Sequence, residues 1–281
     1  MFTNLSELNK AFLYFAIVFA LCFGATQLTP MLGVHALKVA MVTPLVAVLL
    51  MLLAVTRDGA SRENWHGLGL HRAGVAGWAL ALVLPLVVLG FSFGALWLSG
   101  VGTFVAPQVD SFPAYLLDIA ASIVIVALIG GIGEEIGWRG YLLPRLMKLG
   151  MYPALLLSGF AHGLFHLPAI LGTPYYHADG DPLIVIPLFL ATLTLAGVCY
   201  GYLRLTTESV WPAALAHSAF NIFWGRFSAF TQTESPLTVE YLAGESGVLT
   251  LIALTVTALW LALRLRRSDA VQQPVVRSAP V

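Results

Sequence analysis

The sequence predicts an all-α, polytopic membrane protein. Of its 281 residues, 59% are hydrophobic and only 10% are charged, whereas a typical soluble domain carries about 25% charged residues. Apolar stretches recur along the chain at the length of roughly 17–25 residues that a helix needs to cross a ~30 Å hydrocarbon layer. These stretches are continuous rather than alternating, which favours helices over the strands of a barrel.

Six to eight stretches have this character, and we expect about eight transmembrane helices in a single transmembrane domain of residues 1–281. Their expected bounds are Ala11–Leu28, Val34–Val55, Gly74–Leu98, Ala114–Ile136, Tyr152–Leu171, Leu183–Leu205, Val210–Phe223 and Val248–Leu263. Proline and glycine mark several of the connections between them. The polar residues 268–281 are expected to form a short disordered C-terminal tail.

The distribution of charge predicts an orientation. If both termini are cytoplasmic, twelve of the fourteen Lys and Arg residues, Arg139 among them, fall on the inner side, and only Lys38 and Arg226 fall outside. This asymmetry is the one that the positive-inside rule describes. We therefore expect a multi-pass integral protein of the plasma (inner) membrane with cytoplasmic termini. The net charge of zero argues against a nucleic-acid partner, which would require a basic surface.

Polar side chains gather at three places in the expected helices. Glu134, Glu135 and Arg139 lie at the inner end of the fourth helix. The fifth helix carries His162 and His166, and the seventh carries His217 and Asn221. Ionisable groups cost roughly 2.5–3.5 kcal/mol each on insertion into a membrane, so their presence requires an explanation. Each cluster alone has a structural one, such as charges that reach out of a helix end or a hydrogen-bonded pair that joins two helices. Together they can supply a general base, a second proton-handling group and donors for an oxyanion.

Helical spacing separates the two adjacent carboxylates. Glu135 and Arg139 are four positions apart, so they share a face and can form an ion pair. Glu134 lies ~100° around the helix from Glu135 and lacks that partner. Because Glu134 is close to the inner end of the expected fourth helix, we expect the site to open toward the cytoplasm. The two cysteines, Cys22 and Cys199, lie in apolar stretches without a CxxC pair, which predicts buried free thiols.

In this order, the motifs EExxxR, a histidine followed by Leu-Pro, and HxxxN resemble the CPBP family of membrane proteases (CAAX protease and bacteriocin-processing, also Abi), which is related to the CAAX prenyl endopeptidases. The resemblance covers about 131–221, inside an expected catalytic core of about residues 114–225. It implies that Glu134 is the general base that activates a water molecule and that His166 holds or deprotonates this water. It also implies that His217 and Asn221 bind the oxyanion.

The resemblance places Glu135 and Arg139 in supporting positions behind the catalytic residues. The second motif of the family is usually FxxxH, and here His162 stands where the phenylalanine is expected. The role of His162 is therefore open, and we group it with the supporting residues.

The function that the resemblance implies is a metal-independent, glutamate-type intramembrane endopeptidase. It would need no cofactor, would lie in a lipid bilayer and would act on a membrane-associated peptide or protein. A zinc-dependent membrane metalloprotease is one alternative, because three histidines and Glu134 could bind zinc, although no HExxH motif is present. A non-enzymatic immunity or scaffold protein is another. The natural substrate and the oligomeric state stay open.

Overall fold

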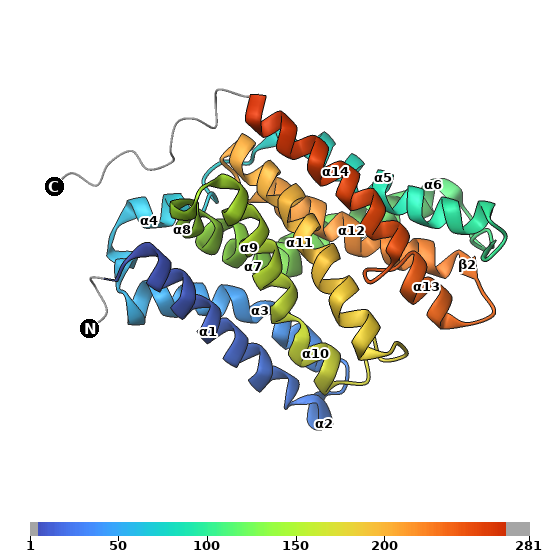
Figure 1. Ribbon diagram of the computed structural model, residues 1–281, viewed down its shortest axis with the longest axis horizontal. Helices are drawn as coiled ribbons and strands as arrows, with labels where there is room; N and C mark the ends of the chain where they lie inside the picture. Colours follow the sequence, from blue (N-terminus) through green and yellow to red (C-terminus); the bar gives the residue numbers. More distant parts are fainter. Residues whose placement is uncertain (1–4, 268–281) are drawn as a thin grey trace.

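The structure is a computed structural model that describes residues 5–267, and the described chain forms a helical bundle (Figure 1). Seven of its helical segments are long and apolar enough to cross a membrane: Glu7–Thr26, His35–Val55, Val75–Leu98, Phe112–Leu149, Met151–Gly172, Pro182–Thr207 and Val248–Arg267. They lie at seven of the eight expected positions, so the prediction of an all-α polytopic membrane protein is confirmed. The expected tail, 268–281, lies outside the described residues.

The helices have the following bounds: α1 (Glu7–Thr26), α2 (Thr29–Leu32), α3 (His35–Leu50), α4 (Arg62–Gly67), α5 (Trp78–Leu98), α6 (Phe112–Val126), α7 (Ile132–Glu135), α8 (Leu143–Leu146), α9 (Met151–Phe165), α10 (Leu167–Gly172), α11 (Pro182–Thr207), α12 (Trp211–Ala229), α13 (Pro236–Leu242) and α14 (Val248–Arg267). Two short strands, β1 (Thr103–Phe104) and β2 (Thr231–Gln232), pair in antiparallel fashion. Cys22 and Cys199 are buried and free, as expected.

The seventh expected span is a helix, α12, that is too polar to count among the seven apolar segments. It has 19 residues, so its composition rather than its length sets it apart: His217, Asn221 and Arg226 interrupt the apolar sequence. Its small residues Ala213 and Ala219 have no exposed surface, which allows neighbouring helices to approach closely. We propose that α12 is the eighth crossing.

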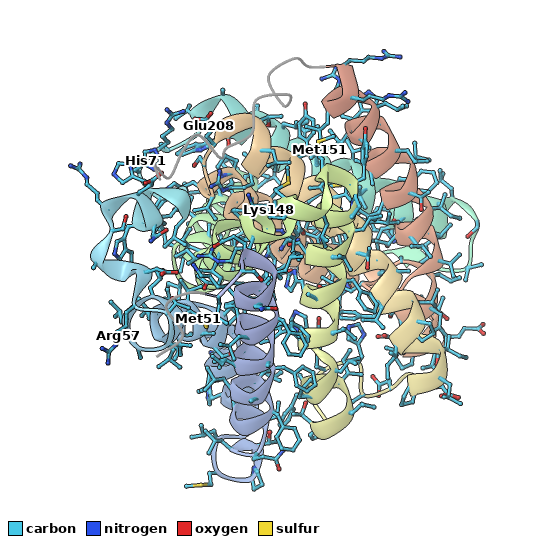
Figure 2. The ribbon with its side chains drawn as sticks, turned by 60° about the vertical axis from the view of Figure 1, so that its left-hand side comes forward. Met51, Arg57, His71, Lys148, Met151 and Glu208 are labelled. Atoms are coloured by element: carbon cyan, nitrogen blue, oxygen red, sulfur yellow. The ribbon has the colours of Figure 1, made fainter. Side chains whose placement is uncertain are left out.

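Contacts between the loops that connect the helices define the two ends of the bundle. At one end Lys10 Nζ lies 2.9 Å from Asp58 Oδ2, and the Ser209 hydroxyl donates to the Arg72 carbonyl at 2.6 Å. Figure 2 labels residues of the connections at this arginine-rich end, among them Arg57. At the other end, β1 pairs with β2, and the loop before α11 contacts the segment between α13 and α14. Because α12 begins at the first end and stops at the second, it runs between the ends as the other spans do.

The fourth span is longer than expected, since it was predicted to stop at Ile136 and continues to Leu149 over 38 residues. It includes two π-helical segments, Ala127–Gly131 and Ile136–Leu142, on either side of α7. Such segments are uncommon and often lie at functional sites. Other helices cover this part of the chain closely: a Cβ atom added to Gly137 would lie 2.1 Å from Tyr14 Oη. Protein rather than lipid therefore surrounds the polar residues, and the helix can continue past them.

This length corrects two expectations. Glu134 lies in the interior of the fourth span rather than at its inner end. Arg139 has no exposed surface, so it belongs to the bundle interior and not to the inner loops that set the charge asymmetry.

Candidate active site

The fourth and fifth spans bring their polar residues to the same depth. The fourth span ends at Leu149 and the fifth begins at Met151. Glu134 stands fifteen positions before Leu149 (149 − 134) and His166 fifteen after Met151 (166 − 151), which at 1.5 Å per residue is ~22 Å from the turn in both helices. His166 also stands directly after the last residue of α9, Phe165, and before α10, whose second residue is Pro168. Proline cannot continue the hydrogen-bond pattern of α9, so the helix breaks at His166.

His162 is the residue closest to Glu134. Its Nε2 lies 2.9 Å from Glu134 Oε2, and its Nδ1 lies 3.2 Å from Arg139 Nη1. Because a guanidinium only donates hydrogen bonds, Nδ1 must accept, and the ring proton is then on Nε2. Arg139 thus fixes the tautomer in which His162 donates a hydrogen bond to Glu134.

Glu135 organises the seventh span in a similar way. Its Oε1 accepts a hydrogen bond from Arg139 at 3.0 Å, so the ion pair expected from their spacing is present. The same oxygen lies 2.9 Å from His217 Nδ1. A carboxylate only accepts, so His217 carries a proton on Nδ1, and its Nε2 donates only when the ring is protonated on both nitrogens. Neither Glu135 nor Arg139 has an exposed side chain.

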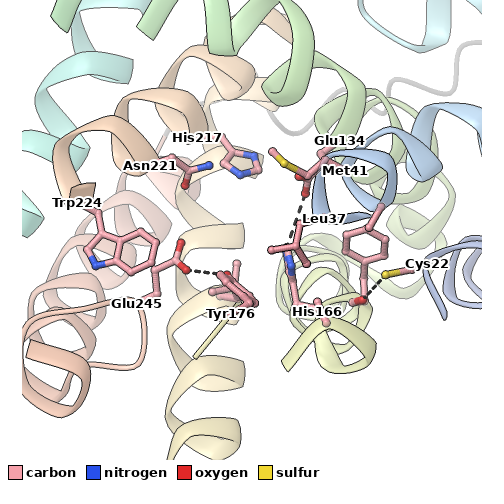
Figure 3. A pocket seen from close by; sticks show the side chains of 14 residues that line it. Cys22, Leu37, Met41, Glu134, His166, Tyr176, His217, Asn221, Trp224 and Glu245 are labelled. Atoms are coloured by element: carbon pink, nitrogen blue, oxygen red, sulfur yellow. Dashed lines mark hydrogen bonds and ion pairs between the residues drawn. The ribbon is translucent and has the colours of Figure 1, made fainter. Parts of the chain in front are cut away.

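The four residues to which we assign catalytic roles line one cavity of about 210 Å³. In Figure 3, Glu134 and His166 lie on one side of it, and His217 and Asn221 project from α12. The two closest atoms of Glu134 and His166, Oε2 and Nε2, are 3.9 Å apart. This distance is too long for a direct hydrogen bond but suits one water molecule that contacts both.

Residues 116–223 match the family model of the type II CAAX prenyl endopeptidase Rce1-like proteins. The chain contains an Rce1-like domain. This similarity supports a CAAX-protease-like intramembrane endopeptidase. Such an enzyme is itself an integral membrane protein, and it hydrolyses peptide bonds. No curated protein matches the sequence.

All seven residues singled out from the sequence fall within the Rce1-like domain and lie together. The structure places His162 against Glu134 itself rather than behind it, and His166 slightly farther away. The phenylalanine usual at this position could not make the hydrogen bond that His162 makes, so this chain differs from the family pattern at the carboxylate.

The cavity does not extend toward the arginine-rich end, as the position expected for Glu134 suggested. On that side Tyr14, Trp138 and Tyr141 are fully buried and fill the space between α1 and the fourth span. The cavity instead includes Tyr176 and Glu245, which belong to connections at the opposite end. The expectation of an opening at the arginine-rich end is therefore wrong.

Three residues of the cavity wall that carry polar groups, Tyr176, Trp224 and Glu245, were not predicted from the sequence. Trp224 and Glu245 lie outside the matched residues 116–223, and none of the three belongs to a motif. The only feature that marks Glu245 in the sequence is its position in a short polar segment, Gly244-Glu245-Ser246, between apolar residues.

Proposed function

We propose that this protein is a metal-independent, glutamate-type intramembrane endopeptidase in which Glu134 is the general base. The observation that supports this most directly is the environment of Glu134. One of its oxygens accepts a hydrogen bond from His162 and stands 3.9 Å from His166, at the wall of a cavity that can hold water. A carboxylate so held is positioned to take a proton from a water molecule.

In the proposed reaction, Glu134 removes a proton from a water molecule that contacts both Glu134 and His166. The resulting hydroxide adds to the carbonyl carbon of the scissile peptide bond, and the carbonyl oxygen becomes an oxyanion. Asn221 and protonated His217 donate hydrogen bonds to this oxygen. The bond between carbon and nitrogen then breaks, and the proton held by Glu134 passes to the departing amine. The products are a carboxylic acid and an amine, and Glu134 is ionised again.

A zinc protease is the second candidate, because ligand atoms of Glu134, His162 and His217 lie within 4.8 Å of one another. Zinc binds an unprotonated imidazole nitrogen. In His162 the nitrogen that faces Glu134 carries the proton, since the other nitrogen accepts from Arg139. Zinc binding would require His162 to move its proton to the nitrogen that faces a guanidinium donor. This arrangement favours the metal-independent mechanism.

The substrate we propose is a membrane-associated peptide or protein segment. It must be unwound where it is cut, because the carbonyl groups of a helix are engaged in hydrogen bonds and shielded from water. We further propose that the protein lies in the plasma (inner) membrane with both termini cytoplasmic, from the charge asymmetry that remains when Arg139 is left out. The cavity then opens away from the cytoplasm.

The test is a comparison of peptides in membranes from cells that produce the wild-type protein, Glu134→Gln or the control Glu234→Gln, in which an exposed glutamate is changed. Peptides released by the wild type and by Glu234→Gln should be absent with Glu134→Gln. Glutamine can still accept the hydrogen bond of His162, so this variant should fold. Equal release of the same peptides by the folded Glu134→Gln protein would exclude Glu134 as the base.

A further inference from the structure

A second carboxylate lies on the cavity wall away from Glu134. Glu245, between α13 and α14, is only 7% exposed and lines the same cavity as the catalytic residues. Figure 3 shows Glu245 beside Trp224 and Tyr176, with Glu134 and His166 across the cavity from them. The proposed peptidase mechanism does not use Glu245.

Glu245 is held in place by a network that joins two loops. The Tyr176 hydroxyl donates to Glu245 Oε2 at 2.6 Å, and His177 Nε2 lies 3.5 Å from the same oxygen. The other nitrogen of His177 lies 2.5 Å from Glu240 Oε1, which also accepts from Ser246. All contacts of Glu245 described here are made by Oε2, so Oε1 is the oxygen that can serve a ligand in the cavity.

The network has a net negative charge at neutral pH. Burial lowers the pKa of His177, but its hydrogen bond to Glu240 and its ion pair with Glu245 outweigh burial and raise the pKa to about 9. Burial raises the pKa of Glu245, but its ion pair with His177 and its hydrogen bond from Tyr176 lower it overall. Burial, reinforced by the charge of Glu245, raises the pKa of Tyr176 well above its usual value. One imidazolium and two carboxylates therefore leave one negative charge.

The rest of the cavity wall does not neutralise this charge. Its fourteen lining residues include two carboxylates, Glu134 and Glu245, and no lysine or arginine. The cation of the proposed mechanism, protonated His217, is held by Glu135 behind the wall. Arg139 lies behind the wall, where it is paired with Glu135. Trp224 adds an aromatic surface next to Glu245, and an indole attracts cations through its π electrons. A carboxylate and an indole at one end of this cavity favour a cationic ligand group.

We propose that Glu245 and Trp224 form a specificity subsite that binds a lysine or arginine side chain of the peptide substrate. This inference rests on the proposed endopeptidase function, because the bound residue belongs to the segment that is cut. The basic side chain extends from the cleavage site to Glu245 Oε1, and its methylene groups contact Trp224. The enzyme then prefers peptides with a basic residue at one fixed position from the cut.

The test measures binding to a protein that cannot cleave. Glu134→Gln is purified in detergent, and its affinity is measured by fluorescence anisotropy for labelled ten-residue peptides of leucine and alanine. The peptides carry at one central position lysine, arginine, norleucine or glutamate. Since Glu134→Gln has lost the other carboxylate of the cavity, any remaining preference for a cation reports on Glu245.

The lysine and arginine peptides should bind about 10- to 100-fold more tightly than the norleucine peptide, the range expected for one charge-assisted hydrogen bond. A second change, Glu245→Gln, should remove this difference, and Glu234→Gln in the same background should keep it. Glutamine can accept the Tyr176 hydrogen bond, and thermal unfolding checks that the variant is folded. Equal affinities for the lysine and norleucine peptides, or a preference that survives Glu245→Gln, would overturn the subsite. Because no cleavage is measured, this result is independent of whether Glu134 is the base.

Discussion

Glu135 and Arg139 form a buried ion pair whose energetics can be tested by removing one partner or both. Removing one partner of such a pair leaves an uncompensated charge, at a cost of about 3–5 kcal/mol. In a chain of this size, 1 kcal/mol corresponds to roughly 2–4 °C in the unfolding midpoint. Glu135→Leu and Arg139→Met should each lower the midpoint by roughly 6–20 °C.

The double variant, Glu135→Leu with Arg139→Met, should unfold at a higher temperature than either single variant. The pair is only partly satisfied, since Glu135 Oε2 and the Nε and Nη2 atoms of Arg139 have no hydrogen-bond partner among the described residues. Apolar side chains of similar size can therefore replace both charges at little cost. The midpoints are measured by scanning fluorimetry in one detergent, and the double-mutant cycle gives the coupling energy.

Recovered stability should not restore cleavage. In the double variant His217 loses the acceptor that orients it, and His162 loses the donor that fixes its tautomer. We expect a folded protein whose activity is at least ~100-fold below that of the wild type, the order associated with general acid–base groups. A double variant no more stable than the single ones would refute the reasoning about charge compensation. A stable and fully active one would refute the proposed roles of the pair at His162 and His217.

Three further predictions concern metal, orientation and pH. Cleavage should survive EDTA and phenanthroline, and elemental analysis of the purified protein should find no stoichiometric zinc; activity lost to chelators and restored by zinc would support the metalloprotease. In a protein without Cys22 and Cys199, an impermeant maleimide added to intact cells should label a cysteine at Tyr175 and not one at His71; the reverse pattern would invert the orientation. Because the pKa of His177 is raised to about 9, its stabilising effect should be complete below about pH 6.5 and be lost as the pH rises through 9. The unfolding midpoint of the wild type should then fall more between pH 7 and pH 10 than that of His177→Gln, and equal falls would contradict the charge state assigned to His177.

The helices could be predicted from the sequence wherever contact with lipid requires a long run of apolar residues. Long apolar runs such as α5 and α11 have few alternatives in a membrane, and the expected and observed bounds agree within a few residues. The end of the fourth helix could not be predicted, because it depends on which neighbours cover Glu134 and Arg139. The close approach of Tyr14 to Gly137 is a property of the packed bundle and leaves no mark in local hydropathy.

In the candidate site too, contacts within one helix could be predicted from the sequence, and contacts between helices or loops could not. The pair of Glu135 and Arg139 follows from helical spacing within one element, and it could be read directly from the sequence. The hydrogen bond between His162 and Glu134 joins two helices, and its formation depends on their relative rotation and depth. The contact of Tyr176 with Glu245 joins two loops separated by 69 positions, so only the tertiary structure reveals that the cavity has an acidic far wall.

The polarity of α12 has a consequence for how the chain enters the membrane during synthesis. With its two polar residues His217 and Asn221, to which we assign catalytic roles, α12 gains less free energy on leaving the translocation channel alone than the apolar spans do. Only a short turn separates it from α11, whose 26 residues are strongly apolar. The two helices can therefore partition into lipid together as a hairpin, in which Tyr200 of α11 covers the His217 ring until His217 meets Glu135 of the fourth span. His217 and Asn221 thus disfavour the insertion of α12 into lipid on its own, although the proposed catalysis needs them. Insertion together with α11 allows α12 to keep both residues.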